Sequence, residues 1–259
     1  MTEAPTVHIR REAREGGVVA FVTLDNERKL NVLSSGLMDA FATAMARVSA
    51  EDDLRAVVLS GAGERAFVGG ADVDEMAAID GPAAARAFIT RVHRCCAAVR
   101  NCPAPVIARI PGWALGAGLE LAASCDLRVA ADTARFGMPE VKLGIPSVVE
   151  AAILPGIIGW GRVRDMLLLG ETFDATRALA MGLVEAVVPL ADLDGAVEAR
   201  VTMLLANGAR AVRLQKALIN RWEDLSIRNS IAAGIDSFAA AFETDEPSSA
   251  MAKWRSDHT

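Results

Sequence analysis

Short apolar runs alternate along most of the chain with longer segments whose apolar residues recur at helical spacing. Two runs, Val7–Arg10 and Val18–Leu24, flank a charged turn that contains glycine, and they predict a β-hairpin. Four further strands are expected at Ala56–Ser60, Pro105–Ile110, Asp126–Ala130 and Leu183–Val188. Because helices separate these strands, crossover connections and a largely parallel sheet are expected.

The helical pattern begins at Ser34, which is expected to cap a helix reaching about Ala50. A second helix is expected over Pro82–Arg100. After Leu190 only helical periodicity remains, over Ala191–Ala206, Ala209–Ile219, Ile227–Phe242 and Ser248–Trp254. The pattern therefore predicts an α/β core in residues 1–190, followed by a helical C-terminal region in residues 191–259, without an independent domain.

Composition narrows the class of protein. The 259 residues carry a net charge of −6 and no long block of Lys or Arg, which argues against a nucleic-acid or anionic-membrane surface. No apolar run approaches the roughly 18 residues of a membrane span, and the charged N-terminal segment does not resemble a signal peptide. The four cysteines follow neither a zinc nor a C-x-x-C spacing, so reduced thiols in a cytoplasmic protein are expected.

One carboxylate, Glu120, lies in the otherwise uncharged stretch WALGAGLELAAS. An ionised group removed from water costs several kcal/mol unless it is paired or hydrogen-bonded, so this residue needs a partner, an opening to solvent, or a task. Familiar templates are absent from the sequence: it has no phosphate loop, no H-E-x-x-H and no G-x-S-x-G. His93 is interpreted as a surface or packed helix residue.

Two glycine-containing loops follow predicted strands, at Gly61–Met76 and Pro111–Leu121. Each enters a helix, at Ala71 and at Ala117, where backbone N–H groups lack intrahelical partners. Either loop alone is compatible with an ordinary strand-to-helix turn. Two such helix beginnings facing one another would form a site for a developing anion.

A second carboxylate, Glu140, lies in the apolar stretch ARFGMPEVKLGIP. Taken alone it is compatible with an exposed loop. Two carboxylates in a dry pocket can divide acid and base duties, because burial and mutual repulsion separate their pKa values.

These motifs together resemble the crotonase superfamily, the enoyl-CoA hydratases and isomerases. The matching segments are LNVL, AFVGGADVDEM, PVIARIPGWALGAGLELAASCDLRVAA, ARFGMPEVKLGIP and MGLVEAVVP, in that order along the chain. The resemblance implies a spiral core of ββα repeats, an acyl-CoA thioester substrate, and a C-terminal region that forms a homotrimer or a hexamer. It implies no metal and no redox cofactor, since coenzyme A is part of the substrate.

By the same resemblance, the backbone N–H groups of Ala71 and Ala117 form an oxyanion hole for the thioester oxygen. Glu120 activates the attacking water, and Glu140 exchanges the proton at the α-carbon. The implied coenzyme A contacts are Arg28, Lys29, Gly69, Gly70, Asp72 and Val73, with Lys253 or Arg255 reaching a neighbouring subunit's ligand. For Arg28 and Lys29, a solvated surface role is equally compatible with the sequence.

The sequence departs from the family pattern after Glu140, where Val148, Val149 and Glu150 replace small residues. The implied substrate pocket, which also includes Trp113 and Gly116, should be narrower and accept a short or branched acyl chain. Glu150 is either an extra catalytic or substrate-binding group or a helix-start residue favoured by the dipole.

Retention of both glutamates favours hydration of a 2-enoyl-CoA. The alternatives are an isomerase, another crotonase-type acyl-CoA lyase or hydrolase, a catalytically idle subunit, and an RNA-binding relative, which the net negative charge disfavours.

Overall fold

The computed structural model describes residues 4–258, so the extreme ends of the two predicted parts, residues 1–3 and 259, lie outside the described chain. Within it, six strands form the larger sheet in the order β1-β2-β3-β5-β7-β10. Their bounds are β1 Thr6–Arg14, β2 Gly17–Asp25, β3 Leu54–Gly61, β5 Val106–Ile110, β7 Leu127–Ala131 and β10 Ala186–Val188. The β1–β2 hairpin is antiparallel and the remaining pairs are parallel, which confirms both expectations.

A smaller sheet, in the order β4-β6-β8-β9, was not predicted from the sequence pattern. Its strands are β4 Ala66–Val68, β6 Trp113–Leu115, β8 Arg135–Gly137 and β9 Thr172–Asp174. Three residues are too few to show a two-residue hydrophobic alternation. Each of β3, β5 and β7 is followed by a strand of the small sheet and then by a helix, which is α-helical after β4 and β6 and a 3-10 helix after β8, and this confirms the ββα repeat.

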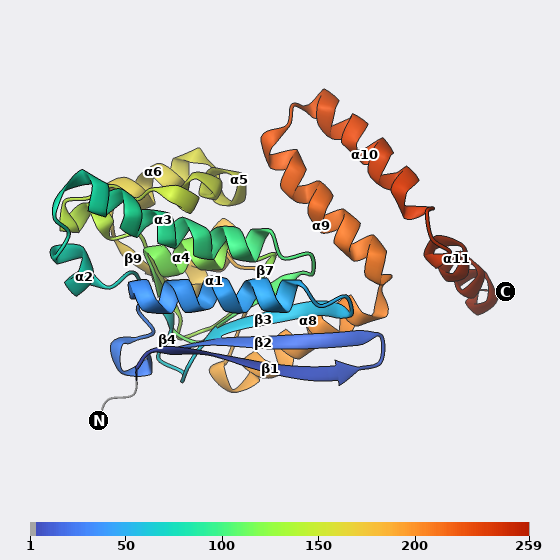
Figure 1. Cartoon of the computed structure of the whole chain (residues 1–259), viewed down its shortest axis with the longest axis horizontal. Helices are drawn as coiled ribbons and strands as arrows, with labels where there is room; N and C mark the ends of the chain where they lie inside the picture. Colours follow the sequence, from blue (N-terminus) through green and yellow to red (C-terminus); the bar gives the residue numbers. More distant parts are fainter. Residues whose placement is uncertain (1–3, 259) are drawn as a thin grey trace.

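Helices cover both faces of the larger sheet (Figure 1). The longer ones are α1 Ser35–Ser49, α3 Gly81–Arg100, α6 Trp160–Leu169, α8 Leu193–Ala206, α9 Ala209–Asp224, α10 Ile227–Ala241 and α11 Glu246–Asp257. Shorter ones are α2 Val73–Ala77, α4 Ala117–Ala123, α5 Leu154–Ile158 and α7 Ala175–Met181. Short 3-10 helices occur at η1 Glu27–Lys29, η2 Glu140–Leu143, η3 Val149–Ile153 and η4 Leu190–Asp192.

The start of α1 and its buried face agree with the sequence prediction. The Ser34 hydroxyl accepts a hydrogen bond from the N–H of Leu37, as expected of an N-cap. Leu37, Phe41 and Met45 are fully or almost fully buried on the face that the pattern identified. Helices α1, α3 and α4 contribute to one apolar cluster.

The opposite face of the larger sheet is covered by α8, whose Leu193, Val197 and Val201 pack against residues of the strands, including Val19 and Val58. The first helix after residue 190 is thus part of the layered core. Helices α9 and α10 form an arm beside the core, and α11 lies at its far end (Figure 1). No helix within residues 4–258 is both long and apolar enough to cross a bilayer.

Lys216 anchors α9 to the core. Its ammonium group is buried and donates to the carbonyls of Val99 (3.3 Å) and Ala104 (3.1 Å) and to Oδ2 of Asp126 (2.7 Å). A buried cation is tolerated only when its three donors are satisfied, and here all three are.

Replacing Lys216 with methionine is expected to lower the free energy of unfolding by roughly 3 kcal/mol, because Asp126 and two carbonyls lose their partner while the chain volume is kept. Denaturant unfolding of the variant measures the change. Lys253→Met, on the exposed surface of α11, is the matched control and should change stability by no more than about 0.5 kcal/mol. Equal stability of the two variants would contradict this anchoring role.

Candidate active site

The small sheet brings the predicted site residues to one edge. Strands β4, β6 and β8 are parallel neighbours, so their carboxyl ends lie side by side. The chain leaving β4 reaches Ala71, the chain leaving β6 reaches Ala117, and the chain leaving β8 reaches Glu140. Residues separated by 20 to 70 positions in sequence therefore meet because three short strands pair.

The first loop presents the backbone of Ala71 to this edge. Gly70 has φ +122°, a conformation that side chains rarely allow. The carbonyl of Gly70 accepts from Leu33 N–H (2.8 Å), and the N–H of Asp72 donates to the Leu33 carbonyl (3.0 Å). These two hydrogen bonds involve the Gly70 carbonyl and the Asp72 N–H, on either side of Ala71. The N–H of Ala71 itself takes no part in them. The Asp72 side chain caps α2.

The second loop places Ala117 and Glu120 on one short helix. Gly116 has φ +50°, and a Cβ at this position would collide with Oε1 of Glu140. Ala117 is the first residue of α4, so its N–H belongs to the turn that lacks intrahelical acceptors. Glu120 follows three positions later, about one helical turn along the same face.

These residues line one cavity of about 680 Å³. Ala71, Ala117, Glu120 and Glu140 all contribute to its wall. So do Gly69, Gly70, Val73, Gly116 and Val148, which the sequence also singled out, together with Met76, Ile79, Pro82, Ala85, Arg86, Phe88, Ile89, Val92, Leu115, Pro139, Leu143, Ile145 and Pro146. The wall from α3 went unrecognised, because an apolar helical stripe gives the same sequence signal whether it faces a core or a pocket.

Several residues predicted from the resemblance lie outside this wall. Trp113, Val149 and Glu150 are not among the residues that line the cavity. Arg28 and Lys29 do not line it either. The Lys29 ammonium instead contacts Asp72 (3.4 Å) and the exposed Asp74 (3.0 Å), and these carboxylates raise its pKa. Its coenzyme A contact, like that of Arg28, stays a prediction.

Lys253 and Arg255 lie in α11, the last helix of the chain. This helix is at the far end of the arm in Figure 1, away from the loops around α2 and α4. The predicted contact of these residues with a neighbouring subunit's ligand stays a prediction.

Glu120 is almost completely buried, with 3% of its surface exposed. Its Oε1 accepts a hydrogen bond from the N–H of Ala151 (3.1 Å). Burial raises the pKa of Glu120 to about 8, and the negative charges of Glu140 and Glu150 add to this, whereas the Ala151 N–H opposes it. The buried acid thus holds a proton well above the pH at which an exposed glutamate ionises.

Glu140 is only partly buried and is held by a residue that the sequence did not identify. The Ser147 hydroxyl donates to Oε2 of Glu140 at 2.8 Å. Seven positions separate the two residues, and the turn that joins them is irregular beyond η2. No spacing rule pointed to Ser147.

Glu150 lies in the first turn of η3, as expected for a helix-start residue, but its side chain has a further contact. Its Oε1 lies 2.7 Å from Nδ1 of His93 on α3. His93, which the sequence suggested was a surface or packed residue, is half exposed at 54% of its side chain.

The raised pKa of Glu120 predicts how stability depends on pH. The folded protein binds the proton of Glu120 more tightly than the unfolded chain does, so this residue destabilises the fold progressively as pH rises from about 4.5 to about 8. Glu120→Gln removes the ionisation, and the variant should gain stability over the wild type as pH rises through this range. Urea unfolding at pH 5, 7 and 9 tests this, with Glu64→Gln on an exposed loop as the control. A stability difference that does not change with pH would contradict the raised pKa.

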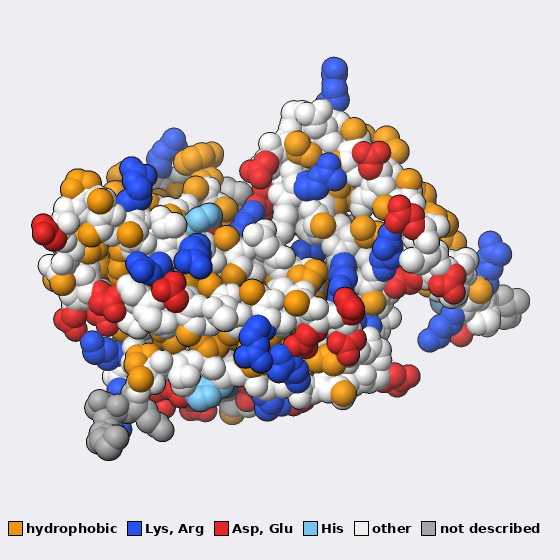
Figure 2. All heavy atoms as spheres, in the orientation of Figure 1, with side chains coloured by type: hydrophobic (Ala, Val, Ile, Leu, Met, Phe, Trp, Pro, Cys, Tyr) orange, Lys and Arg blue, Asp and Glu red, His pale blue; other side chains and the backbone are white. Residues whose placement is uncertain are grey.

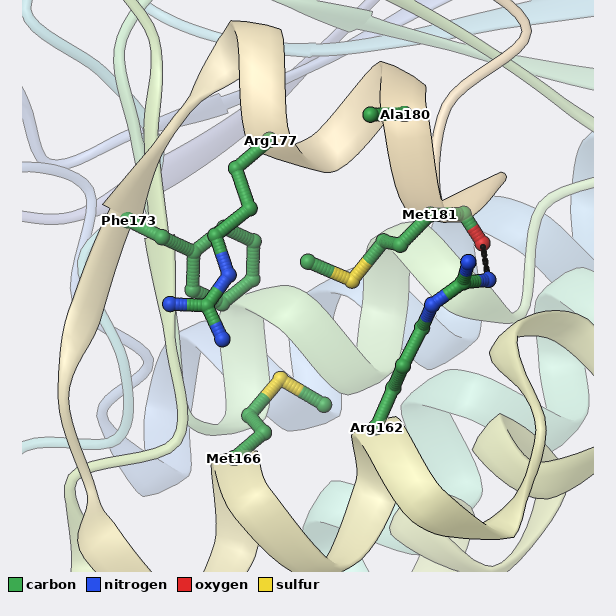
Figure 3. Close-up of a pocket in the computed structure, with 6 residues that line it drawn as sticks. All are labelled: Arg162, Met166, Phe173, Arg177, Ala180 and Met181. Carbon is green, nitrogen blue, oxygen red and sulfur yellow. Dashed lines mark hydrogen bonds between the residues drawn. The ribbon is translucent and has the colours of Figure 1, made fainter.

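A second, smaller cavity of about 220 Å³ lies between α6, β9 and α7 (Figure 3). It is lined by Arg162, Met166, Phe173, Arg177, Ala180 and Met181. Arg162 donates to the carbonyl of Met181 (2.9 Å), and Arg177 pairs with Asp165 (2.5 Å). Its arginines are occupied and no carboxylate lines it, so the larger cavity is the candidate active site.

Comparison with known proteins identifies the family of this chain. The family model described as enoyl-CoA hydratase/isomerase matches residues 14–255. The chain belongs to the enoyl-CoA hydratase/isomerase family. This confirms the resemblance to the crotonase superfamily that the sequence motifs indicated.

Individual members of the enoyl-CoA hydratase/isomerase family match over nearly their full length. A probable enoyl-CoA hydratase, echA8, of Mycobacterium tuberculosis is 36% identical over 95% of this chain and 93% of its own length. A short-chain-enoyl-CoA hydratase of Clostridium acetobutylicum is 34% identical over 91% and 90%. A crystal structure of enoyl-CoA hydratase from Bacillus anthracis has a TM-score of 0.91 at 30% identity, covering 97% of this chain and 96% of that one.

Proposed function

We propose that the protein is an enoyl-CoA hydratase, which adds water syn across the C2=C3 bond of a 2-enoyl-CoA thioester. The observation that carries this proposal is one cavity whose wall contains the backbone of Ala71 just before α2, that of Ala117 at the start of α4, and two acids, Glu120 and Glu140. Relatives named short-chain-enoyl-CoA hydratase and crotonyl-CoA hydratase support it.

In the proposed mechanism, the thioester oxygen accepts hydrogen bonds from the N–H groups of Ala71 and Ala117. As the oxygen of water bonds to C3, Glu120 takes one proton from the water, and negative charge develops on the thioester oxygen. Preorganised N–H donors stabilise that charge without reorienting. Glu140 then supplies the proton that bonds to C2, so the elements of one water are added.

The electrostatics of Glu120 fit the role of base. A base is most effective when its pKa lies near the working pH, and burial raises the pKa of Glu120 to about 8. The two acids act as one coupled unit, so a proton taken by Glu120 returns to Glu140 as the next water binds. We propose that this chemistry uses no metal or redox cofactor, because coenzyme A enters with the substrate.

A side-by-side assay tests the reaction class. Purified protein should remove the conjugated-enoyl absorbance of crotonyl-CoA by hydrating it, and should leave a 3-enoyl-CoA unchanged. Turnover of the 3-enoyl substrate without hydration of crotonyl-CoA would assign the protein as an isomerase instead. A series of enoyl-CoA substrates of increasing chain length and branching then tests our proposal that short or branched chains are preferred, since Val148 lines the cavity.

We further propose that the C-terminal helices assemble the chain into a homotrimer or a hexamer. Helix α10 carries a row of large apolar side chains that are more than half exposed in the single chain, and Figure 2 shows apolar side chains along the outer edge of this arm. They are Ile227, Ile231, Ile235 and Phe238, and Phe242 directly follows the helix. The alternative that they form an intramolecular core does not hold in the described chain.

Phe238→Asp is expected to reduce the assembly to monomers, because it buries a charge in an apolar interface. Light scattering coupled to gel filtration measures the mass. Asp236→Asn on the same helix is the control and should keep the wild-type mass. A wild-type protein that elutes as a monomer would refute the proposed assembly.

We also propose that the protein acts in the cytoplasm. All four cysteines, Cys95, Cys96, Cys102 and Cys125, are buried free thiols, as is usual in a reducing compartment.

A further inference from the structure

A third acid lies behind the wall of the candidate active site. Glu150 is buried, with 6% of its surface exposed, and it does not line the cavity. The next residue, Ala151, donates its N–H to Oε1 of Glu120 (3.1 Å). One short helix, η3, therefore carries both the charge of Glu150 and a hydrogen bond to the candidate base.

The carboxylate of Glu150 depends on His93. Its Oε1 lies 2.7 Å from the imidazole Nδ1, while its Oε2 is buried and has no hydrogen-bond partner within residues 4–258. A buried carboxylate with one unsatisfied oxygen is costly unless its charge is neutralised nearby. The imidazole of His93 is the group beside Glu150 that can carry a compensating positive charge, and its half-exposed ring connects the pair with solvent.

The backbone at the start of η3 is strained. Val149 has φ +42°, a region that β-branched residues rarely adopt. Such a conformation persists only where surrounding contacts enforce it, and it often accompanies a functional site. The contact between Glu150 and His93 is one restraint that fixes η3 against α3.

We propose that His93 and Glu150 form a positioning pair for Glu120, in which His93 holds Glu150 and thereby fixes the orientation of η3 and the charge behind the candidate base. The contact between His93 and Glu150 does not depend on what reaction the protein catalyses. The effect of this pair on catalysis by Glu120 rests on the proposed hydratase function.

Charges of both signs lie around this pair. Glu140 of η2 and the α3 residues Cys95, Cys96 and His93 are near Glu120 and Glu150. Also on α3, Arg91 and Arg94 pair with Asp39 of α1, and Arg86 lines the cavity with Glu120. Helix α5 (Leu154–Ile158) brings no titratable side chain. Beyond burial and Glu140, Glu150 also raises the pKa of Glu120. The charge state of the pair should therefore be transmitted to Glu120.

Substitutions of Glu150 and of His93 should shift the pH dependence of kcat in opposite directions. Glu150→Gln keeps the side-chain shape and removes a negative charge, so the acidic limb of the kcat profile should move to lower pH by about half a unit or more. His93→Gln keeps a hydrogen-bond donor but removes the ring, whose positive charge when protonated opposes the negative charge of Glu150. Its limb should move to higher pH. In both variants KM for crotonyl-CoA should stay near that of the wild type.

Arg94→Gln is the matched control, since it removes a positive charge on α3 that is paired with Asp39 instead of Glu150, and its limb should not move. A purely structural role would lower thermal stability in both variants without opposite shifts. The inference is overturned if the limb of Glu150→Gln does not fall or that of His93→Gln does not rise. Should Glu150→Gln fail to fold, His93→Gln, on the half-exposed side of the pair, carries the test.

A direct titration separates this inference from the proposed function. The carbon-13 signal of the Glu120 carboxyl, assigned by its loss in Glu120→Gln, reports ionisation without turnover. If the wild type does not hydrate crotonyl-CoA, but the Glu120 titration shifts in opposite directions in Glu150→Gln and His93→Gln, the positioning pair is supported and the proposed function is refuted. If the wild type hydrates crotonyl-CoA and neither variant shifts the Glu120 titration, the function is supported and the positioning pair is refuted.

Discussion

Glu140→Gln is expected to lower kcat for the hydration of crotonyl-CoA by roughly two to four orders of magnitude, with a much smaller change in KM. The amide keeps the size of the side chain and can still accept the hydrogen bond from Ser147. It can no longer deliver a proton to C2. The loss should therefore fall on the chemical step and leave substrate binding nearly intact.

Glu120→Gln should cause a loss of similar size, because the attacking water then has no base. The double variant should be only slightly worse than either single variant, since the two acids act as one coupled unit in the addition. Steady-state kinetics of the three variants measure this. Glu64→Gln is the control and should retain wild-type kcat. A Glu140→Gln variant with more than a tenth of wild-type kcat would remove this residue from the proposed chemistry.

Ala117→Pro is expected to lower kcat by about 100- to 1,000-fold, the usual effect of losing one oxyanion-hole donor. Ala117 is the first residue of α4, where proline is well tolerated because its fixed φ suits a helix start and the missing N–H has no intrahelical acceptor. The substitution thus removes the proposed donor with little other change to the helix.

Ala117→Gly supplies the comparison for this prediction, since it alters the side chain but keeps the N–H. It should retain most of the wild-type kcat. Circular dichroism and thermal unfolding establish that both variants are folded. If a folded Ala117→Pro protein hydrated crotonyl-CoA at close to the wild-type rate, the thioester oxygen would have to be stabilised elsewhere.

Features that depend on residues close together in the sequence were predictable from the sequence. The hairpin follows from two β-rich runs around a glycine turn, and the start of α1 follows from a Ser34 side chain that accepts a bond three residues ahead. The isolation of Glu120 among apolar residues marked it as a candidate site residue, and the structure shows that it is buried. The order of the motifs identified the family, and the full-length match confirms it.

The tertiary structure decided how these pieces meet. The pairing of β4, β6 and β8 joins segments far apart in the chain, and each strand is only three residues long. Such pairing is specified by packing across the molecule and leaves no periodic trace in any one segment. The bond from Ser147 to Glu140 and the pair formed by His93 and Glu150 likewise depend on how separate elements approach each other.

The sequence by itself determined the local elements, the family and the identity of two acids in apolar surroundings, because these are properties of short segments and of their order. Only the tertiary structure decided that Glu120 and Glu140 face one cavity and that α3 provides its apolar wall. It also decided that a third acid, Glu150, lies behind Glu120. Burial and the charge of one carboxylate upon another arise between segments, so no single stretch of the chain contains them.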